Sequence, residues 1–168
     1  MKAMELVRWA LQLSDEGTAG LVEAMRETPM TPSTPGGKAG DGNHSIWTLG
    51  HLCVIEGGVP EILLGEPNPV EKWKPLFSSG TKPSADASVY PSFDELLKTY
   101  RSLRARNMKL LEQVGEAGLE RVPVKVPPGL ENAMKTFGHT LLLVALHNMV
   151  HYGQIADARR VAGHKPLM

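Results

Sequence analysis

The segment between residues 132 and 163 constrains the fold more strongly than any other part of the chain. Its apolar residues recur at helical spacing, Asn132 or Thr136 can cap its start, and Gly163 marks its end. Residues 137–150 are apolar almost all round, and a helix of that kind is buried on several sides. The chain must therefore surround this helix with other helices, with or without a second subunit.

Two further segments in the N-terminal half have the apolar spacing of helices. The first covers about residues 4–25, and the second begins near Asn43 or Ser45. Pro60 should bend or end the second helix, because it has no amide proton for the helical ladder. A last helical turn is expected at residues 62–64.

The third helical segment along the chain, which begins near Ser92, has the clearest start. Ser92 and Glu95 fit a capping box, in which each side chain bonds the other residue's backbone amide. Its apolar stripe continues to Gly115, where we expect the helix to stop. In residues 121–128 valines alternate with polar or proline residues, which predicts a short extended piece at an edge or on its own.

Long connections rich in proline and glycine separate these helices. Residues 29–42 form one of them, and residues 66–91 form a longer one that should drape the surface or cover a site. Trp73 and Phe77 are its expected anchors in the core. The pattern predicts an all-α protein, a four-helix bundle with long proline-rich connections, in one domain over residues 1–168.

Composition excludes several classes of function. Lysine and arginine total 18, as do aspartate and glutamate, so no basic surplus favours nucleic acid. The longest apolar run, residues 141–146, is too short to span a membrane. Cys53 is the only cysteine, which excludes an intramolecular disulfide and a thiolate cage for zinc. Because residues 1–10 carry charges, we expect no secretory signal and a cytoplasmic protein.

His147 and His151 are the first candidates for chemistry. Four residues of helix place the two rings about 40° apart on one face and about 6 Å apart along the axis, so both can bind one metal ion. Chance pairs of this kind are common, and core histidines can be satisfied by hydrogen bonds. Two buried imidazoles side by side nevertheless need a shared partner.

His51 strengthens the metal hypothesis. It lies on the second helix, on the side that it shares with Trp47 and Ile55. Three imidazoles from two packed helices form an open site, with a position left for water or substrate. Imidazole ligands suit zinc, nickel, copper and iron, of which we favour zinc or nickel. Metal binding requires neutral imidazoles, so affinity should fall as the pH drops through about 6.5.

Other candidate residues fit a metal site less well. Cys53 points about 200° away from His51 around the helix and is interpreted as core filler. His139 could line a pocket near the site, His44 shares the face of His51, and His164 lies beyond the last helix. Asn107 is interpreted as a residue that sets the helix register. Residue 148 is not glutamate, so the zinc metalloprotease motif and its general base are excluded.

Two stretches of the sequence resemble the DinB/YfiT-like family of metalloenzymes. Residues 47–52 read WTLGHL, and residues 147–155 read HNMVHYGQI, whose YGQI ending is typical of the family. The resemblance covers nearly the whole chain and implies a four-helix bundle with metal ligands at His51, His147 and His151. No catalytic residue is assigned beyond these ligands.

The resemblance also suggests a reaction. Some characterised relatives are transferases and isomerases that use a low-molecular-weight thiol such as bacillithiol or mycothiol. We therefore expect a metal-dependent enzyme acting on a small molecule, in which the metal activates a thiol cosubstrate. A hydrolase using metal-bound hydroxide and a non-catalytic metal-binding protein are the alternatives.

The last helix also suggests an assembly. Leu142, Ala145 and Met149 lie opposite the two histidines. Such a second apolar face can be buried inside the bundle or against a partner. We predict a twofold homodimer with helices at its interface.

Overall fold

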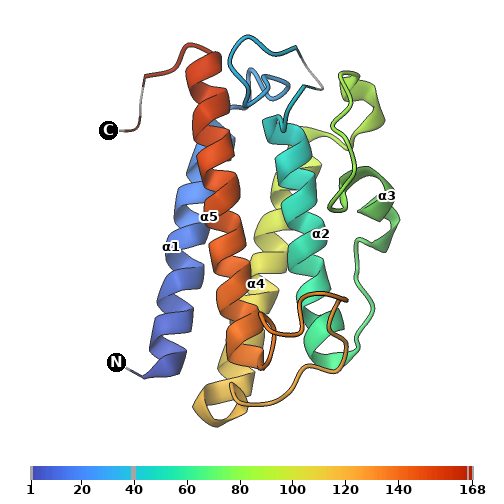
Figure 1. Ribbon diagram of the computed structural model, residues 1–168. Coiled ribbons are helices and arrows are strands. Elements are labelled where there is room, and N and C mark those ends of the chain that lie inside the picture. The colour runs from blue at the N-terminus through green and yellow to red at the C-terminus, as the bar shows by residue number, and fades with distance from the viewer. Residues whose placement is uncertain (1, 39–40, 166, 168) are drawn as a thin grey trace.

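The computed structural model describes residues 2–38, 41–165 and 167. Within these residues the chain is all-helical, and its only β-type pairing is an isolated bridge between Pro32 and His44. Four long helices form a bundle (Figure 1). The helices are α1 (Ala3–Ala24), α2 (Ser45–Leu64), η1 (Glu71–Trp73), α3 (Lys74–Phe77), η2 (Ala87–Val89), α4 (Phe93–Gly118) and α5 (Phe137–Val161). The predicted fold class is thus confirmed.

The long helices run in two directions. Figure 1 shows α1 and α5 running one way and α2 and α4 the other way. Ion pairs fix the antiparallel pairing of α1 with α4, since Arg8 bonds Glu112 near one end and Arg26 bonds Asp94 near the other. Because α2 and α4 are parallel, the chain between them must return along the whole of α2, which is about 30 Å. This requirement explains the length of the connection.

The connection between α2 and α4, residues 66–92, packs against the bundle instead of hanging free. It contains η1, α3 and η2, and it buries Trp73 and Phe77 in the core as the sequence predicts. Phe77 fits closely because residue 50 of α2 is glycine. A Cβ atom built on Gly50 would clash with the Phe77 ring.

Helix α2 continues through Pro60, where the sequence predicts a bend or an end. Pro60 cannot donate a hydrogen bond to the carbonyl of Glu56. Asn107 of α4 supplies the missing donor, since its Nδ2 lies 3.0 Å from that carbonyl oxygen. The helix ends instead at Gly65, whose φ of 75° is the left-handed conformation that favours glycine.

The helix caps agree with the sequence in part. Thr136 caps α5, as predicted, and Ser92 caps α4 by accepting from the Glu95 amide, which is one half of the predicted capping box. Helix α2 is capped by His44, whose ring accepts a hydrogen bond from the Trp47 amide, and not by Asn43 or Ser45. The alternating valines of residues 121–128 do not form a strand; this segment is a loop that the backbone hydrogen bond from Lys125 to Ile62 ties to α2.

The interior consists of two apolar clusters with a polar layer between them. One cluster lies toward the residue 25 end of α1, and the other lies toward the residue 7 end. The polar layer is buried and draws on all four long helices. Its members are Ser14, Thr18, Glu56, Arg104, Asn107 and Asn148.

Helix α5 is less completely buried than its composition predicts. Ala145 lies in the core, at 2% exposure, so it cannot contribute to an outer face. Leu146, Met149 and Val150 are exposed. These three apolar side chains of α5 therefore face solvent in the single chain. None of the helices in the described residues is both long and apolar enough to cross a bilayer.

Candidate metal centre

The three predicted histidines meet between α2 and α5. Their ligand nitrogens all lie within 4.8 Å of one another. The Nε2 atom of His147 is 3.0 Å from Nε2 of His51 and 3.1 Å from Nε2 of His151. His51 and His151 are buried, whereas His147 is partly exposed. The helical spacing thus brings the three residues to one point.

Hydrogen bonds on the outer side of two rings fix their tautomers. The Nδ1–H of His51 donates to the carbonyl oxygen of Phe77 at 2.6 Å. The Nδ1–H of His151 donates to Oε1 of Gln154 at 2.8 Å. A neutral imidazole carries one proton, so Nε2 of each of these rings presents a lone pair to the centre.

Gln154 is itself held in place. Its Oε1 accepts a second hydrogen bond, from Nδ2 of Asn43, at 3.0 Å. The loop before α2 therefore orients a side chain that orients His151. Contacts of this kind fix the ring and raise the basicity of a metal-binding nitrogen.

The three residues fit a divalent transition metal. Nε2 of His51 and Nε2 of His151 each present a lone pair toward Nε2 of His147, an arrangement in which the three nitrogens can share one cation. In a tetrahedral site with bonds of about 2.0–2.1 Å, nitrogen ligands are about 3.3 Å apart, close to the 3.0 and 3.1 Å that separate Nε2 of His147 from the other two Nε2 atoms. The histidines are thus placed to hold a metal ion, and imidazole ligands suit zinc, nickel, copper and iron alike.

The surroundings keep these imidazoles neutral. Burial and the neighbouring histidines lower the pKa of His147 and of His151 to about 4. Burial also lowers the pKa of His51. All three rings are consequently neutral at pH 7, the form that binds metal.

One side of the centre is closed by aromatic packing. The Trp47 ring stacks on the His51 ring, with centroids 5.0 Å apart and planes at 6°. Nε1 of Trp47 donates to the carbonyl oxygen of Leu76, which ties the ring to the connection between α2 and α4. The exposed side lies around His147, the partly exposed member of the three.

The remaining candidates lie outside the centre. His44 is buried and caps α2, and its Nε2 donates to the Ser84 carbonyl. His139 bonds Thr136 and lines a separate hollow of about 180 Å³, about 12 Å along the helix from His147. Cys53 is buried and donates to the Leu96 carbonyl, and burial raises the pKa of its thiol. His164 is exposed beyond α5.

The role of Gln154 was not predicted from the sequence. Its position three residues after His151 could have suggested one, because residues three apart on a helix are neighbours. Phe77 offers only its backbone carbonyl, and Asn43 acts from a loop. Neither leaves a signal in the sequence that points to the centre.

The fold and the centre together define a class of protein, the helical bundle that gathers histidines from two helices around a place for one metal ion. Within this class, the sequence profile of the DinB superfamily matches residues 10–155. The chain therefore belongs to the DinB superfamily. Curated protein sequences contain no significant match to it.

Proposed function

We propose that the protein is a metal-dependent enzyme that transfers a low-molecular-weight thiol to a small electrophilic molecule. The observation that carries the proposal is the convergence of three Nε2 atoms beside a partly exposed histidine. A bound divalent ion would lower the pKa of a coordinated thiol. The thiolate, and not the thiol, is the attacking species.

The thiol must come from outside the chain. Cys53 is buried, its hydrogen bond goes to a backbone carbonyl, and its pKa is raised, so it is a poor nucleophile. The metal-binding group found in the described residues consists of histidines alone. The activating group would therefore be the metal, and the nucleophile would be a cosubstrate.

The residues around the centre have binding and orienting roles in this proposal. The three Nε2 atoms hold the ion, while Phe77 and Gln154 keep the protons of two rings on Nδ1. Trp47 excludes water from one side. The partial exposure of His147 leaves an approach for a small molecule and favours an enzyme over a sealed, non-catalytic metal site.

The test is a comparison of thiol and water as the attacking group. Protein loaded with zinc or nickel is incubated with an aromatic halide or epoxide and a cysteine-derived thiol, and thioether formation is followed. The same protein without thiol is incubated with an activated ester to detect a hydrolase. Thioether formation that depends on metal and is lost in His147→Ala supports the transferase. Metal-dependent ester cleavage alone supports a hydrolase, and a lack of turnover in both assays argues for a non-catalytic protein.

A further inference from the structure

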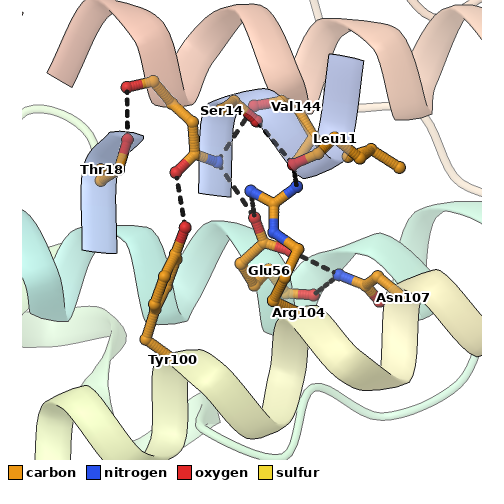
Figure 2. A network of polar contacts seen from close by, with 9 residues as sticks. Leu11, Ser14, Thr18, Glu56, Tyr100, Arg104, Asn107 and Val144 are labelled. Carbon is orange, nitrogen blue, oxygen red and sulfur yellow. Dashed lines mark hydrogen bonds and ion pairs between the residues drawn. The ribbon is translucent and has the colours of Figure 1, made fainter. Parts of the chain in front are cut away.

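The buried polar layer includes Asn148, which directly follows His147, and it takes no part in the proposed chemistry. Figure 2 shows side chains from α1, α2 and α4 meeting in the middle of the bundle, among them Thr18, Glu56 and Tyr100. Glu56 is completely buried. A buried carboxylate is costly unless its oxygens are paired, so its contacts are informative.

Glu56 is held firmly from α4. Nη2 of Arg104 lies 2.7 Å from Oε1 of Glu56, an ion pair whose alignment falls short of a hydrogen bond. Nδ2 of Asn107 donates to Oε2 at 2.7 Å and to the Glu56 carbonyl at 3.0 Å. These contacts join α2 to α4 and make Glu56 a fixed reference point inside the bundle.

Asn148 connects this reference point to the helix that carries two metal ligands. Its Nδ2 donates to Oε1 of Glu56 at 3.1 Å, and its Oδ1 accepts from the Tyr100 hydroxyl at 3.1 Å. Its backbone carbonyl accepts from the Thr18 hydroxyl at 3.5 Å. One residue of α5 thus contacts the other three long helices.

Asn148 lies between the two histidines of α5 in the sequence. It directly follows His147 and precedes His151 by three residues. We propose that Asn148 is a positioning residue, whose hydrogen bonds to Glu56 and Tyr100 fix the rotation and height of α5 so that its two histidines meet His51. The inference rests on the metal centre of the proposed function but not on the reaction that the centre performs.

The required precision supports this role. Side-chain tips lie about 5–6 Å from a helix axis, so rotating α5 by about 20° would move its imidazoles by about 2 Å. A shift of one residue along the axis would move them by about 1.5 Å. Metal bonds tolerate only about 0.2 Å. Apolar contacts are not directional, whereas hydrogen bonds are, and so the polar layer can supply the missing constraint.

The test compares two buried asparagines that bond the same carboxylate. Asn148→Leu removes the tie between α5 and Glu56, whereas Asn107→Leu removes a tie between α4 and Glu56 and leaves α5 untouched. Both variants should lose stability in denaturant unfolding. Only Asn148→Leu should lose affinity for cobalt(II), by about 10–100-fold, with altered visible absorption bands. Asn107→Leu should bind cobalt(II) about as tightly as the parent, because Arg104 still pairs with Glu56 and the bond from Asn148 remains.

Two outcomes overturn the inference alone: cobalt binding by Asn148→Leu as tight as in the parent, or equal losses of affinity in both variants. If Asn148→Leu does not fold, Tyr100→Phe decides, because it deletes only the hydroxyl that holds Oδ1 of Asn148. A several-fold loss of cobalt affinity in Tyr100→Phe supports positioning, and unchanged affinity contradicts it. A parent protein that binds no cobalt contradicts the metal centre itself, whereas tight binding without turnover contradicts only the proposed reaction.

Discussion

Two histidines of the centre depend on different neighbours. His51 is oriented by a backbone carbonyl of the connection, and His151 is oriented by Gln154. His147 is the partly exposed member, next to the open side. The centre is therefore assembled from α2, α5 and the connection between α2 and α4, and a change in any of them should affect metal binding.

Replacing any one ligand should remove the metal and keep the fold. We expect His51→Ala, His147→Ala and His151→Ala to lose bound zinc or nickel in elemental analysis while retaining helical circular dichroism. A metal that binds only the native state adds about 4 kcal/mol at a thousandfold excess over its Kd. A chelator should consequently lower the melting temperature of the parent and leave the variants unchanged.

His139→Ala is the control for this series, because His139 bonds Thr136 and lies away from the centre. It should keep its metal. The alternative is that the three histidines are only polar core residues that bind no metal. Each substitution would then cost about 1–3 kcal/mol of stability, and chelator would have no effect on any of the proteins.

The pH at which metal is lost should be lower than the sequence alone suggests. The value of about 6.5 belongs to exposed imidazole, but the pKa of His147 and of His151 is about 4. Protons therefore compete for these two rings only near pH 4, and burial lowers the pKa of His51 in the same direction. Dialysis at pH 7.5 and 5.5 should leave the metal content equal, and dialysis at pH 4 should remove it. A loss that is complete at pH 5.5 would contradict the buried, neutral histidines.

The metal-free protein should depend on pH in a related way. Its histidines bind protons more weakly when folded than when unfolded, because burial lowers their pKa. Their neutral forms give full stability above pH 6.5, and stability falls as the pH drops from 6.5 toward 4. Melting temperatures of the chelated protein across this range measure the effect. A melting temperature that rises as the pH drops from 6.5 to 4 would show that the pKa values of the histidines are not lowered.

At the scale of the elements, residue spacing in the sequence predicted the helices and the histidine centre, whereas contacts between distant residues determined features that the sequence did not predict. Periodicity located the four long helices, and the spacing of His147 and His151 with His51 predicted the centre. Pro60 was misjudged because the donor that compensates it, Asn107, lies 47 positions away in the sequence. Contacts between distant segments leave no local pattern, and the roles of Phe77 and Gln154 were missed for the same reason.

Gly50 provides a test of how α2 accommodates the connection. Alanine is a better helix former than glycine by about 1 kcal/mol, yet a Cβ atom at this position would clash with the Phe77 ring. We expect Gly50→Ala to destabilise the protein by about 1–3 kcal/mol in urea unfolding. Because Phe77 also orients His51, metal affinity should fall as well.

Gly20 of α1 is the matched control, since nothing lies within 4 Å of a Cβ atom built there. Gly20→Ala should stabilise the protein by up to about 1 kcal/mol and leave metal affinity unchanged. Equal effects of the two substitutions would mean that Phe77 can move away from α2 at little cost. The close packing of the connection would then not be needed to form the centre.

At the scale of the whole molecule, α1 and α5 share an apolar outer surface. The two helices are neighbours, since a Cβ atom on Gly17 would touch Tyr152 and since Leu6 and Leu142 line one hollow. Large apolar side chains on both helices are exposed. They are Leu6, Trp9 and Leu13 on α1, and Leu146, Met149 and Val150 on α5. We call these six residues the α1/α5 face. Exposed apolar side chains that gather on neighbouring helices mark interaction sites in soluble proteins.

We propose that a second copy of the chain covers the α1/α5 face through a twofold axis. Acidic and basic residues are equal in number, 18 each, so two copies do not repel each other through net charge. In a twofold contact the same surface serves both partners, and one apolar face is sufficient. Trp9, with 57% of its surface exposed, offers the largest apolar side chain on this face.

The parent protein should be a dimer in light scattering at micromolar concentration. Trp9→Glu should be a monomer, because burying an unpaired carboxylate at the centre of an interface is strongly unfavourable. Val122→Glu is the matched control. Val122 is exposed too, but it lies in the loop between α4 and α5 and outside the α1/α5 face. This variant should remain dimeric, and both variants should bind metal like the parent. A parent protein that is monomeric under these conditions, or a Trp9→Glu variant that stays dimeric, would show that the face serves some other purpose.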